Sequence, residues 1–350
     1  MASDSAPTSA RPSVAIVTAT AGEGENGIGD YARLLCDALN RHEFSAAHVQ
    51  HDDWSLRGLR QLREALREQN PRLVHLQHPQ GLYGWSLAPQ LLTLLQPAVV
   101  TLHEASRYGP IRGRGRLLPF TVRSPKIVVT SEFERRYVGQ FAPWAKSRLE
   151  VVPIASNVPP RSDHGRPRAR KLVYFGSLRP DRGLEAFLEL STEVVRRIRD
   201  VECLIIGSPV PTSVSYAHGI RARFADAPVE WMSGLTHEEV ADVLVQCRVA
   251  YLPFPDGASE RRGSILAALG CGLPVVTSRG RQTTADLASC LALAKGREES
   301  ISAIEQLATN DEAWRALSER GRKYAARFSW DKIARRHIAL YERSIGEMGG

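Results

Sequence analysis

The sequence predicts an α/β fold made of two doubly wound domains, each with a parallel sheet. Three observations support this prediction. Short, continuously apolar segments recur along the 350 residues, amphipathic segments separate them, and one stretch near the middle is rich in Pro and basic residues and has no apolar period. Continuously apolar strands are typical of sheets covered on both faces, and strand–helix alternation predicts right-handed parallel crossovers. At about 100–200 residues per domain, the length accommodates two.

The strands are predicted from apolar, β-branched runs. In the first half these are residues 14–17, 46–49, 73–76, 98–102, 127–130 and 149–152. In the second half they are residues 172–175, 203–206, 229–232, 249–254 and 274–277.

Helices are predicted from apolar spacing and capping signals. An apolar face that includes Tyr31 and Leu35 predicts a helix that starts after Gly29. Thr236 followed by Glu239 predicts a capping box that opens a helix through Val245. A last helix is predicted over 331–345.

These elements give the following domain organisation. We expect a disordered tail at 1–12, an N-terminal Rossmann-like domain at 13–160, a linker at 161–170 and a C-terminal Rossmann-like domain at 171–327. The helical segment 328–350 could cross back to the N-terminal domain. Ligands of such sheets bind at the carboxyl ends of the strands, so we expect a site in a cleft between the domains.

Composition excludes several classes of protein. With 43% hydrophobic and 24% charged residues, the chain is not disordered, collagenous or a coiled coil. No apolar run reaches the roughly 18 residues of a membrane span, and the first dozen residues lack the pattern of a signal peptide, so a cytoplasmic protein is expected. The net charge of +8 is spread along the chain and does not predict a nucleic-acid partner. Five scattered cysteines, with no CxxC pair, predict neither disulfides nor a zinc site.

The first glycine-rich loop, at 22–29, admits two functional interpretations. Gly22, Gly24 and Gly27 match the dinucleotide fingerprint GxGxxG, which would indicate an NAD-dependent oxidoreductase with an acid at 52 or 53 on the ribose. Acidic residues at 23 and 25 oppose a pyrophosphate there. The more general prediction is that Gly27 and Gly29 bring backbone N–H groups to an anion at a helix N-terminus, and the alternative is a tight turn without ligand.

Polar side chains end two predicted strands of the first domain. His103 ends the strand 98–102, and we expect it to point into the cleft and to hydrogen-bond a substrate hydroxyl. Gln77 and His78, which end the strand before it, are candidates to bind the acceptor. The alternative is that these side chains pack beneath a loop.

Two loops of the second domain carry the charged candidates. The segment 176–183 places Ser177, Arg179 and Arg182 after a strand, where guanidinium groups could clamp a diphosphate; the alternative is a solvated loop. The segment 260–277 is the strongest motif. Its acid, Glu260, and its glycine precede a short apolar helix. Glu260 could accept hydrogen bonds from sugar hydroxyls, and the N-terminus of the helix could bind a phosphate. The alternative is an ordinary surface loop. The phosphate-binding candidates there are Arg262, Gly263 and Ser264.

The absence of DxD, HExxH and GxSxG motifs favours a reaction with no metal and no cofactor. Four features, taken in order, resemble the retaining glycosyltransferases of family 4, also called glycosyl transferases group 1. They are the strand–GxG–helix, the His-acid pair, the GxLRPxRG loop and the ExxG–helix–GxPVV segment. The resemblance covers nearly the whole chain. It implies the GT-B fold and the transfer of a sugar, with retention, from a nucleotide diphosphate sugar to an acceptor hydroxyl.

The resemblance also implies residue roles. Gly29 corresponds to the glycine that meets the donor phosphate and His103 to the histidine near the donor sugar. Arg182 stands at the usual lysine on the diphosphate, and Ser177 stands where an arginine is common.

Glu260 resembles the first acid of the family's ExxxxxxxE motif. The second acid falls on Ala267 or Ala268, so the acid that commonly holds the nucleotide ribose in the family has no counterpart here. The acceptor is a small molecule, a glycan or a lipid-linked compound, and the basic loop 107–116, with Leu117, Leu118 and Phe120 behind it, could touch a membrane. A non-catalytic protein that binds sugar nucleotides stays an alternative, as does an epimerase or hydrolase on the same frame.

Overall fold

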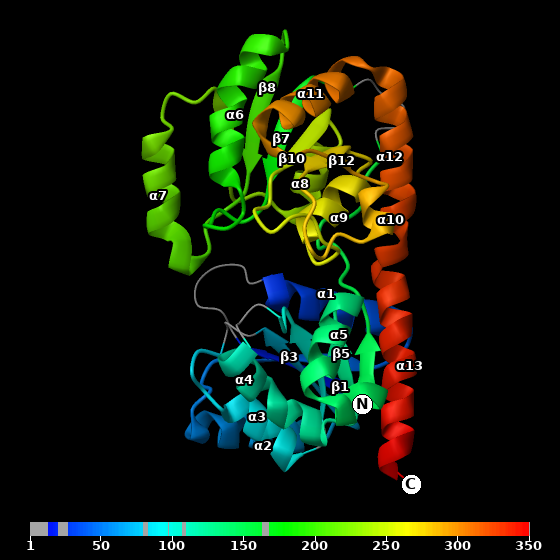
Figure 1. Cartoon of the computed structure of the whole chain (residues 1–350). Coiled ribbons are helices and arrows are strands. Elements are labelled where there is room, and N and C mark those ends of the chain that lie inside the picture. The colour runs from blue at the N-terminus through cyan, green and yellow to red at the C-terminus, as the bar shows by residue number, and fades with distance from the viewer. Residues whose placement is uncertain are drawn as a thin grey trace, which may run out of the picture. The chain divides into compact units, whose positions relative to one another are not determined.

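The computed structural model describes residues 13–19, 27–79, 83–96, 98–106, 110–162 and 168–349. Their contacts divide into two compact units (Figure 1). Of the described residues, unit 1 contains those up to Pro153 and those from Trp330 onward, and unit 2 contains Ile154–Ser329. The chain therefore passes into unit 2 ahead of the predicted linker, and it returns to unit 1 for its last helix.

Unit 1 is built on a six-stranded parallel sheet with the order β2-β1-β3-β4-β5-β6. Its strands are β1 (Val14–Ala19), β2 (Ala46–His51), β3 (Leu73–Pro79), β4 (Ala98–His103), β5 (Ile127–Val129) and β6 (Leu149–Val151). Every residue of β1 and β4 is buried, which is why these strands are continuously apolar rather than alternating.

The helices of unit 1 come from both ends of the chain. They are α1 (Gly27–Arg41), α2 (Leu56–Gln69), α3 (Ala88–Leu95), α4 (Pro110–Arg123), α5 (Glu132–Phe141), the 3-10 turn η1 (Pro143–Arg148) and α13 (Trp330–Gly349). The last helix packs on α1, and the Nε2 atom of His42 lies 2.8 Å from the Asp331 carboxylate. Farther along α13, Arg343 donates to the Glu150 carboxylate at 2.7 Å.

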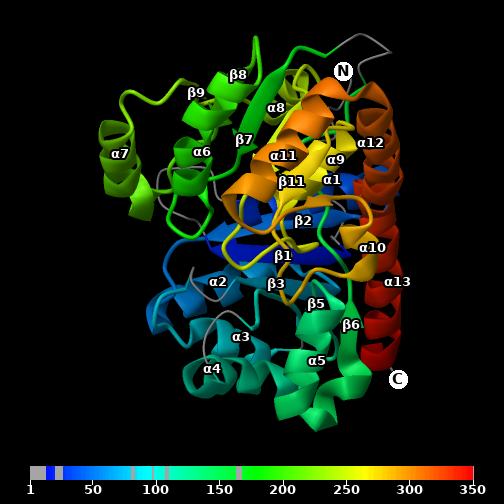
Figure 2. The ribbon, with the colours of Figure 1, turned by 45° about the horizontal axis from the view of Figure 1, so that its top comes forward.

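Unit 2 has a second six-stranded parallel sheet, with the order β12-β11-β10-β7-β8-β9. Its strands are β7 (Lys171–Phe175), β8 (Glu202–Ile206), β9 (Val229–Met232), β10 (Val249–Leu252), β11 (Val275–Thr277) and β12 (Ala292–Leu293). Its helices are α6 (Leu184–Arg197), η2 (Pro211–Ser213), α7 (Val214–Arg223), α8 (His237–Leu244), α9 (Gly263–Gly270), α10 (Ala285–Ala288), α11 (Gly296–Thr309), α12 (Asp311–Ala325) and η3 (Ala326–Phe328). The sheet is drawn from a second side in Figure 2.

The predicted fold class is confirmed, since all eleven predicted strands are present and both sheets are parallel. The edge strand β12 was not predicted, because two half-buried residues give no apolar run. The capping box at Thr236 is also confirmed: its hydroxyl accepts from the Glu239 N–H, and the Glu239 carboxylate accepts from the Thr236 N–H.

Three local predictions need correction. The first helix begins at Gly27 rather than after Gly29. The predicted basic loop 107–116 is helical from Pro110 on, because proline suits the first turn of a helix and Leu117 and Phe120 are fully buried beneath it. In the predicted linker, Arg168 is buried and donates to the Cys247 and Cys271 carbonyls, so this part belongs to unit 2. The predicted tail at 1–12 lies outside the described residues.

Candidate functional site

The carboxyl ends of β7 and β10 mark the topological switch point of unit 2. Strand β7 comes first in the chain, β8 lies on one side of it and β10 lies on the other. The loops that follow β7 and β10 therefore run in opposite directions and leave a crevice at the sheet edge, which is where doubly wound sheets bind ligands. These two loops contain all of the charged candidates, and we call them the unit 2 edge.

A close approach of backbones holds the two loops together. Gly183, at the end of the loop after β7, has φ +79°, and a Cβ there would lie 2.0 Å from the carbonyl oxygen of Pro253. Only glycine avoids both the strained backbone angle and that clash. The geometry of the loop therefore depends on this glycine, and Gly183 has this structural role beside the candidate Arg182.

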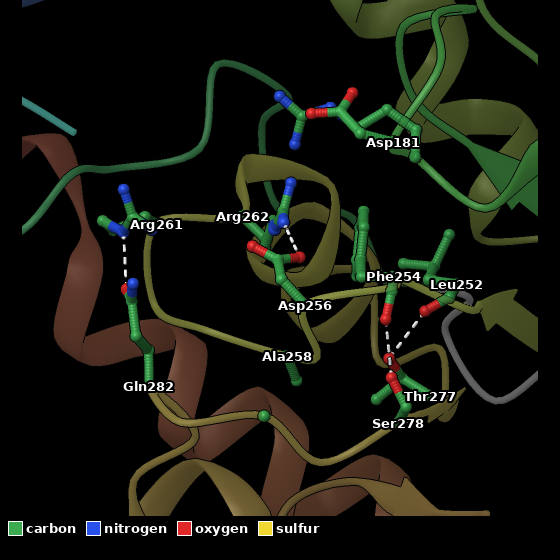
Figure 3. A network of polar contacts seen from close by, with 12 residues as sticks. Asp181, Leu252, Phe254, Asp256, Ala258, Arg261, Arg262, Thr277, Ser278 and Gln282 are labelled. Carbon is green, nitrogen blue, oxygen red and sulfur yellow. Dashed lines mark hydrogen bonds and ion pairs between the residues drawn. The ribbon is translucent and has the colours of Figure 1, made fainter. Parts of the chain in front are cut away.

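Side-chain hydroxyls fix the loop after β10 against the loop after β11 (Figure 3). The Thr277 hydroxyl donates to the Leu252 carbonyl at 2.6 Å, and the Ser278 hydroxyl donates to the Phe254 carbonyl at 2.7 Å. The Ala258 N–H donates to the Ser278 carbonyl at 2.9 Å. The segment that leads to Glu260 is thus held by a rigid scaffold, as a preorganised site requires.

The two arginines after β7 differ from the other cations of this edge, because their Nε atoms are buried and have no hydrogen-bond partner among the described residues. Arg179 makes one long ion pair, 3.6 Å from Nε to the Asp181 carboxylate. The peptide oxygen of Arg182 accepts from the Tyr174 hydroxyl at 3.3 Å, which positions its backbone. Buried donors without partners are costly, so these two guanidinium groups are suited to receive an anion.

Arg262 was predicted to bind phosphate, and in the structure it also has contacts within its own loop. Its side chain is buried, its Nη2 atom pairs with the Asp256 carboxylate, and its guanidinium lies 4.3 Å from the centroid of the Phe254 ring (Figure 3). The neighbouring Arg261 donates to Gln282 at 2.8 Å. Arg262 therefore stabilises the loop by an ion pair and a cation–π contact, and its charge is already compensated.

Helix α9 begins at Gly263 and Ser264, as predicted, so the N–H groups of these two residues have no partner within the helix. Ala267 and Ala268 are buried in this helix, with 2% and 0% exposure. Neither can supply the carboxylate that the resemblance places there.

Glu260 is oriented by two hydroxyl groups. Its Oε1 atom accepts from the Tyr324 hydroxyl at 2.6 Å and from the Thr284 hydroxyl at 3.1 Å. Burial, followed by the nearby Glu260 carboxylate, raises the pKa of Tyr324, so this hydroxyl keeps its proton and stays a donor. Ser177 is half-buried, and its carbonyl accepts from the Arg179 N–H at 3.0 Å.

In unit 1 the candidate His103 lies in a hydrogen-bond network with its neighbours. Its side chain is buried, its Nε2 atom lies 2.8 Å from the Gln77 Oε1 atom, and its ring meets the Tyr31 ring edge-on at 5.5 Å. Burial lowers the pKa of His103 to about 4, so the imidazole is neutral and donates to Gln77. Gln77 is itself buried, so the structure brings these two candidates together in a packed network.

This network extends to a residue that the sequence analysis missed. The His75 ring lies between the Tyr341 hydroxyl, 2.5 Å from Nδ1, and the Thr101 hydroxyl, 2.7 Å from Nε2. Burial lowers the pKa of His75 well below its usual value. A histidine inside an otherwise apolar strand was the signal that could have identified it, because a polar group in such a position needs partners.

His78 differs from its neighbours in this network. It is 1% exposed, it stacks on the Tyr83 ring at 5.2 Å, and both of its ring nitrogens have no hydrogen-bond partner among the described residues. Burial lowers the pKa of His78 to about 3, so the ring is uncharged. Of the two acceptor-binding candidates, His78 is the one with free hydrogen-bonding atoms.

The glycine loop is described only in part. Gly27 and Gly29 lie in the first turn of α1, where their N–H groups have no helical partner, whereas Gly22 and Gly24 lie outside the described residues. Asp53 accepts from the Ser55 N–H at 2.9 Å, so it caps its own turn.

A cavity of about 310 Å³ lies near the unit 2 edge, between α6, the N-terminus of α11 and the ends of β10 and β11. Tyr251, Phe254 and Arg297 are among its lining residues, and none of the predicted site residues is. Over the part of the chain that the structure covers, no group of three or more His, Cys, Asp or Glu residues is placed to hold a metal ion. Within the same residues no helix has the length and apolarity to cross a bilayer.

Comparison with known proteins extends these observations. Residues 25–158 match the model of Glycosyltransferase Family 4, and residues 169–310 match that of Glycosyl transferases group 1. A D-inositol 3-phosphate glycosyltransferase of Segniliparus rotundus is 25% identical over 295 residues, which are 76% of this chain and 64% of that protein. The matched part thus spans less than two thirds of that relative.

Solved structures share the fold. A sucrose-phosphate synthase of Thermosynechococcus elongatus superposes with a TM-score of 0.72 at 16% identity, covering 96% of this chain and 100% of that one. HepE of Anabaena, in complex with UDP-glucose, superposes with a TM-score of 0.69 at 12% identity, covering 94% and 99%. With two six-stranded Rossmann-like units of the GT-B fold, and with family models matched in both, the chain belongs to the family 4, group 1 glycosyltransferases.

Proposed function

We propose that the protein transfers a sugar, with retention of configuration and without a metal, from a nucleotide diphosphate sugar to an acceptor hydroxyl. The observation that carries this proposal is the pair of buried Nε atoms of Arg179 and Arg182 at the switch point of unit 2, neither of which has a hydrogen-bond partner among the described residues. Family membership supports it, as does the binding of UDP-glucose by a protein of the same fold.

The difficult step is the loss of the diphosphate. Negative charge builds on it while the anomeric carbon becomes oxocarbenium-like, so the useful catalyst is positive potential fixed in advance around the phosphates. Arg182 and Arg179 would supply it through guanidinium groups, and the first-turn N–H groups of Gly263 and Ser264 would add oriented dipoles.

Glu260 would hold the sugar. Tyr324 and Thr284 both donate to its Oε1 atom, and we assign its Oε2 atom to a sugar hydroxyl. In unit 1, the neutral His103 and His78 would offer hydrogen bonds to hydroxyl groups without adding charge. No candidate in this set is a carboxylate nucleophile, so we favour a front-face transfer in which the departing phosphate takes the acceptor's proton. A cytoplasmic location stays a prediction.

Arg182→Ala tests the proposal. We expect turnover of the sugar nucleotide to fall about 10²–10³-fold, the usual effect of removing one donor to a developing anion. Arg196→Ala is the matched control, because Arg196 lies in the same unit, is 72% exposed and pairs only with Glu193 in the structure's described part. The anomeric configuration of the product, read by NMR, tests retention.

The donor is identified by a thermal-shift panel of nucleoside diphosphates and their sugars, since a bound ligand raises the melting temperature. Unchanged turnover in Arg182→Ala would refute the assignment of this residue. Tight binding of a donor that is never consumed would favour the second candidate, a non-catalytic sugar-nucleotide-binding protein. The buried alanines at 267 and 268 are the observation that keeps this candidate open.

A further inference from the structure

Unit 1 exposes large apolar side chains on one part of its surface. They come from the turn before α3, from α3 and α4 themselves, and from η1. We call this set the apolar surface: Trp85, Leu87, Leu94, Leu95, Leu118, Val122 and Trp144. The two tryptophans are 83% and 54% exposed, which is unusual for the largest apolar side chain.

Local contacts make this surface continuous. Helices α3 and α4 pack side by side, as both views show (Figures 1 and 2). The Gln90 side chain donates to the Arg116 carbonyl at 3.1 Å, and the Arg116 guanidinium donates to the Ser86 carbonyl at 3.3 Å. Leu118 and Val122 are four residues apart on α4, so they share a face of that helix.

Arg148 ties η1 to the same surface. It donates to the carbonyls of Thr121 at 2.5 Å and Ser124 at 2.7 Å, at the C-terminal end of α4. Trp144 therefore stands beside the end of α4 that carries Val122.

Basic residues outnumber acids in the segments that carry most of the apolar surface. From Tyr83 to Ser131 the sequence contains six Lys and Arg residues and one acid, Glu104. The Arg116 guanidinium lies 5.9 Å from the Trp85 ring centroid. Arg123, the last residue of α4, and Lys146, in η1, are both exposed. An apolar area bordered mainly by cations complements an apolar layer beneath anionic groups.

From this arrangement we infer that the apolar surface docks unit 1 on a bilayer that contains anionic lipid. Exposed tryptophan, leucine and valine would enter the interface, and the surrounding basic residues would lie at the level of the headgroups. Neither α3 nor α4 is long enough to span a bilayer, so the helices would lie along the interface. The inference does not depend on the proposed reaction.

The test uses the full chain and sedimentation with vesicles of phosphatidylcholine alone or with phosphatidylglycerol added. We expect binding only to the anionic vesicles, weakened by salt. A Trp85→Ser, Leu118→Ser, Val122→Ser variant should lose at least about tenfold in partitioning, and Arg123→Glu with Lys146→Glu should lose a similar factor. Brominated lipid should quench tryptophan fluorescence of the wild type.

The matched control is Val195→Ser with Val214→Ser, two exposed valines of unit 2 that are 37% and 41% exposed. This variant should bind vesicles as the wild type does, and melting curves should show that all variants are folded. No sedimentation with anionic vesicles would overturn the inference. So would a wild-type dimer that the triple variant converts to monomer, because the surface would then serve self-association.

Discussion

The two sheets of this protein have the same number of parallel strands, yet their carboxyl edges are chemically opposite. In unit 1 the order β2-β1-β3-β4-β5-β6 places one strand beyond β1, whereas in unit 2 two strands, β8 and β9, lie beyond β7. At the unit 1 edge, buried neutral imidazoles bond to one another through Gln77. At the unit 2 edge, two arginines whose Nε atoms lack a hydrogen-bond partner in the described part of the chain accompany a carboxylate held by two hydroxyl groups.

The difference shows which properties of a binding site the doubly wound fold does not determine. The fold determines where a ligand can sit, at the switch point, but the side chains there determine the charge it can have. The uncharged edge suits hydroxyl groups, and the cationic edge suits phosphates. One architecture used twice can thus recognise the two ends of a transfer reaction.

The largest effect expected from this comparison is acid sensitivity confined to unit 1. Burial lowers the pKa of His103 and of His337 to about 4, against an ordinary 6.5. Between these values the unfolded chain binds protons that the folded chain excludes, so stability falls as the pH falls from about 6.5 towards 4. With His75 and His78 also depressed, we expect unit 1 to lose several kcal/mol by about pH 5 and to melt about 10 °C lower than at pH 7.5.

Calorimetry of the full chain over this pH range is the measurement, because the two units should give separate transitions. His337→Gln should flatten the pH dependence of the unit 1 transition by the share of one histidine. If both transitions shift equally, or neither shifts, the neutral edge is not a source of acid sensitivity.

A second, smaller effect concerns the close approach of the two loops at the unit 2 edge. Gly183→Ala combines a left-handed φ with a Cβ placed 2.0 Å from the Pro253 carbonyl oxygen. Gly234→Ala is a matched control, because Gly234 has φ +73° but a Cβ there meets nothing within 4 Å. We expect the control to cost about 1–2 kcal/mol and Gly183→Ala to cost more by at least about 2 kcal/mol.

Chemical denaturation followed on unit 2 would measure both changes, and donor binding should weaken only in Gly183→Ala. Equal costs for the two variants would mean that the loops after β7 and β10 do not approach as described.

The smallest effects are expected from removing one tyrosine hydroxyl at each edge. Tyr341→Phe leaves a buried ring nitrogen of His75 without its partner and should cost about 1–3 kcal/mol. Tyr324→Phe leaves Glu260 with its bond from Thr284 and should cost about 0.5–1.5 kcal/mol, while donor affinity falls. A larger stability loss in Tyr324→Phe would reverse the contrast between a packed edge and a ligand-binding edge.

Apolar runs predicted the fold well, because a strand buried on both faces is apolar over most of its length. All eleven predicted strands exist, and only the two-residue β12 escaped detection. Boundaries were less predictable: Gly27 looks like a loop residue in sequence, yet it opens α1. The helix over 110–123 was hidden by its glycines and arginines, and its buried Leu117 and Phe120 stabilise it through contacts that sequence does not display.

The sequence predicted where in the fold the site residues lie better than it predicted which residues they contact. The sequence placed Arg182 and Glu260 at strand ends, which the parallel topology requires. It could not foresee that Arg262 pairs with Asp256, or that Glu260 is oriented by Tyr324, 64 residues away. His75 was missed because its partner Tyr341 lies 266 residues later in the chain.

That long separation has a consequence for synthesis on the ribosome. Unit 1 begins with the first strand but needs α13, the last helix, to cover α1 and to give His75 its hydroxyl partner. Unit 2 is contiguous, so it can complete its core while unit 1 still lacks a helix. The emerging chain must therefore keep its earliest sheet partly uncovered until α13 has been synthesised, and it is during that interval that we expect a dependence on chaperones.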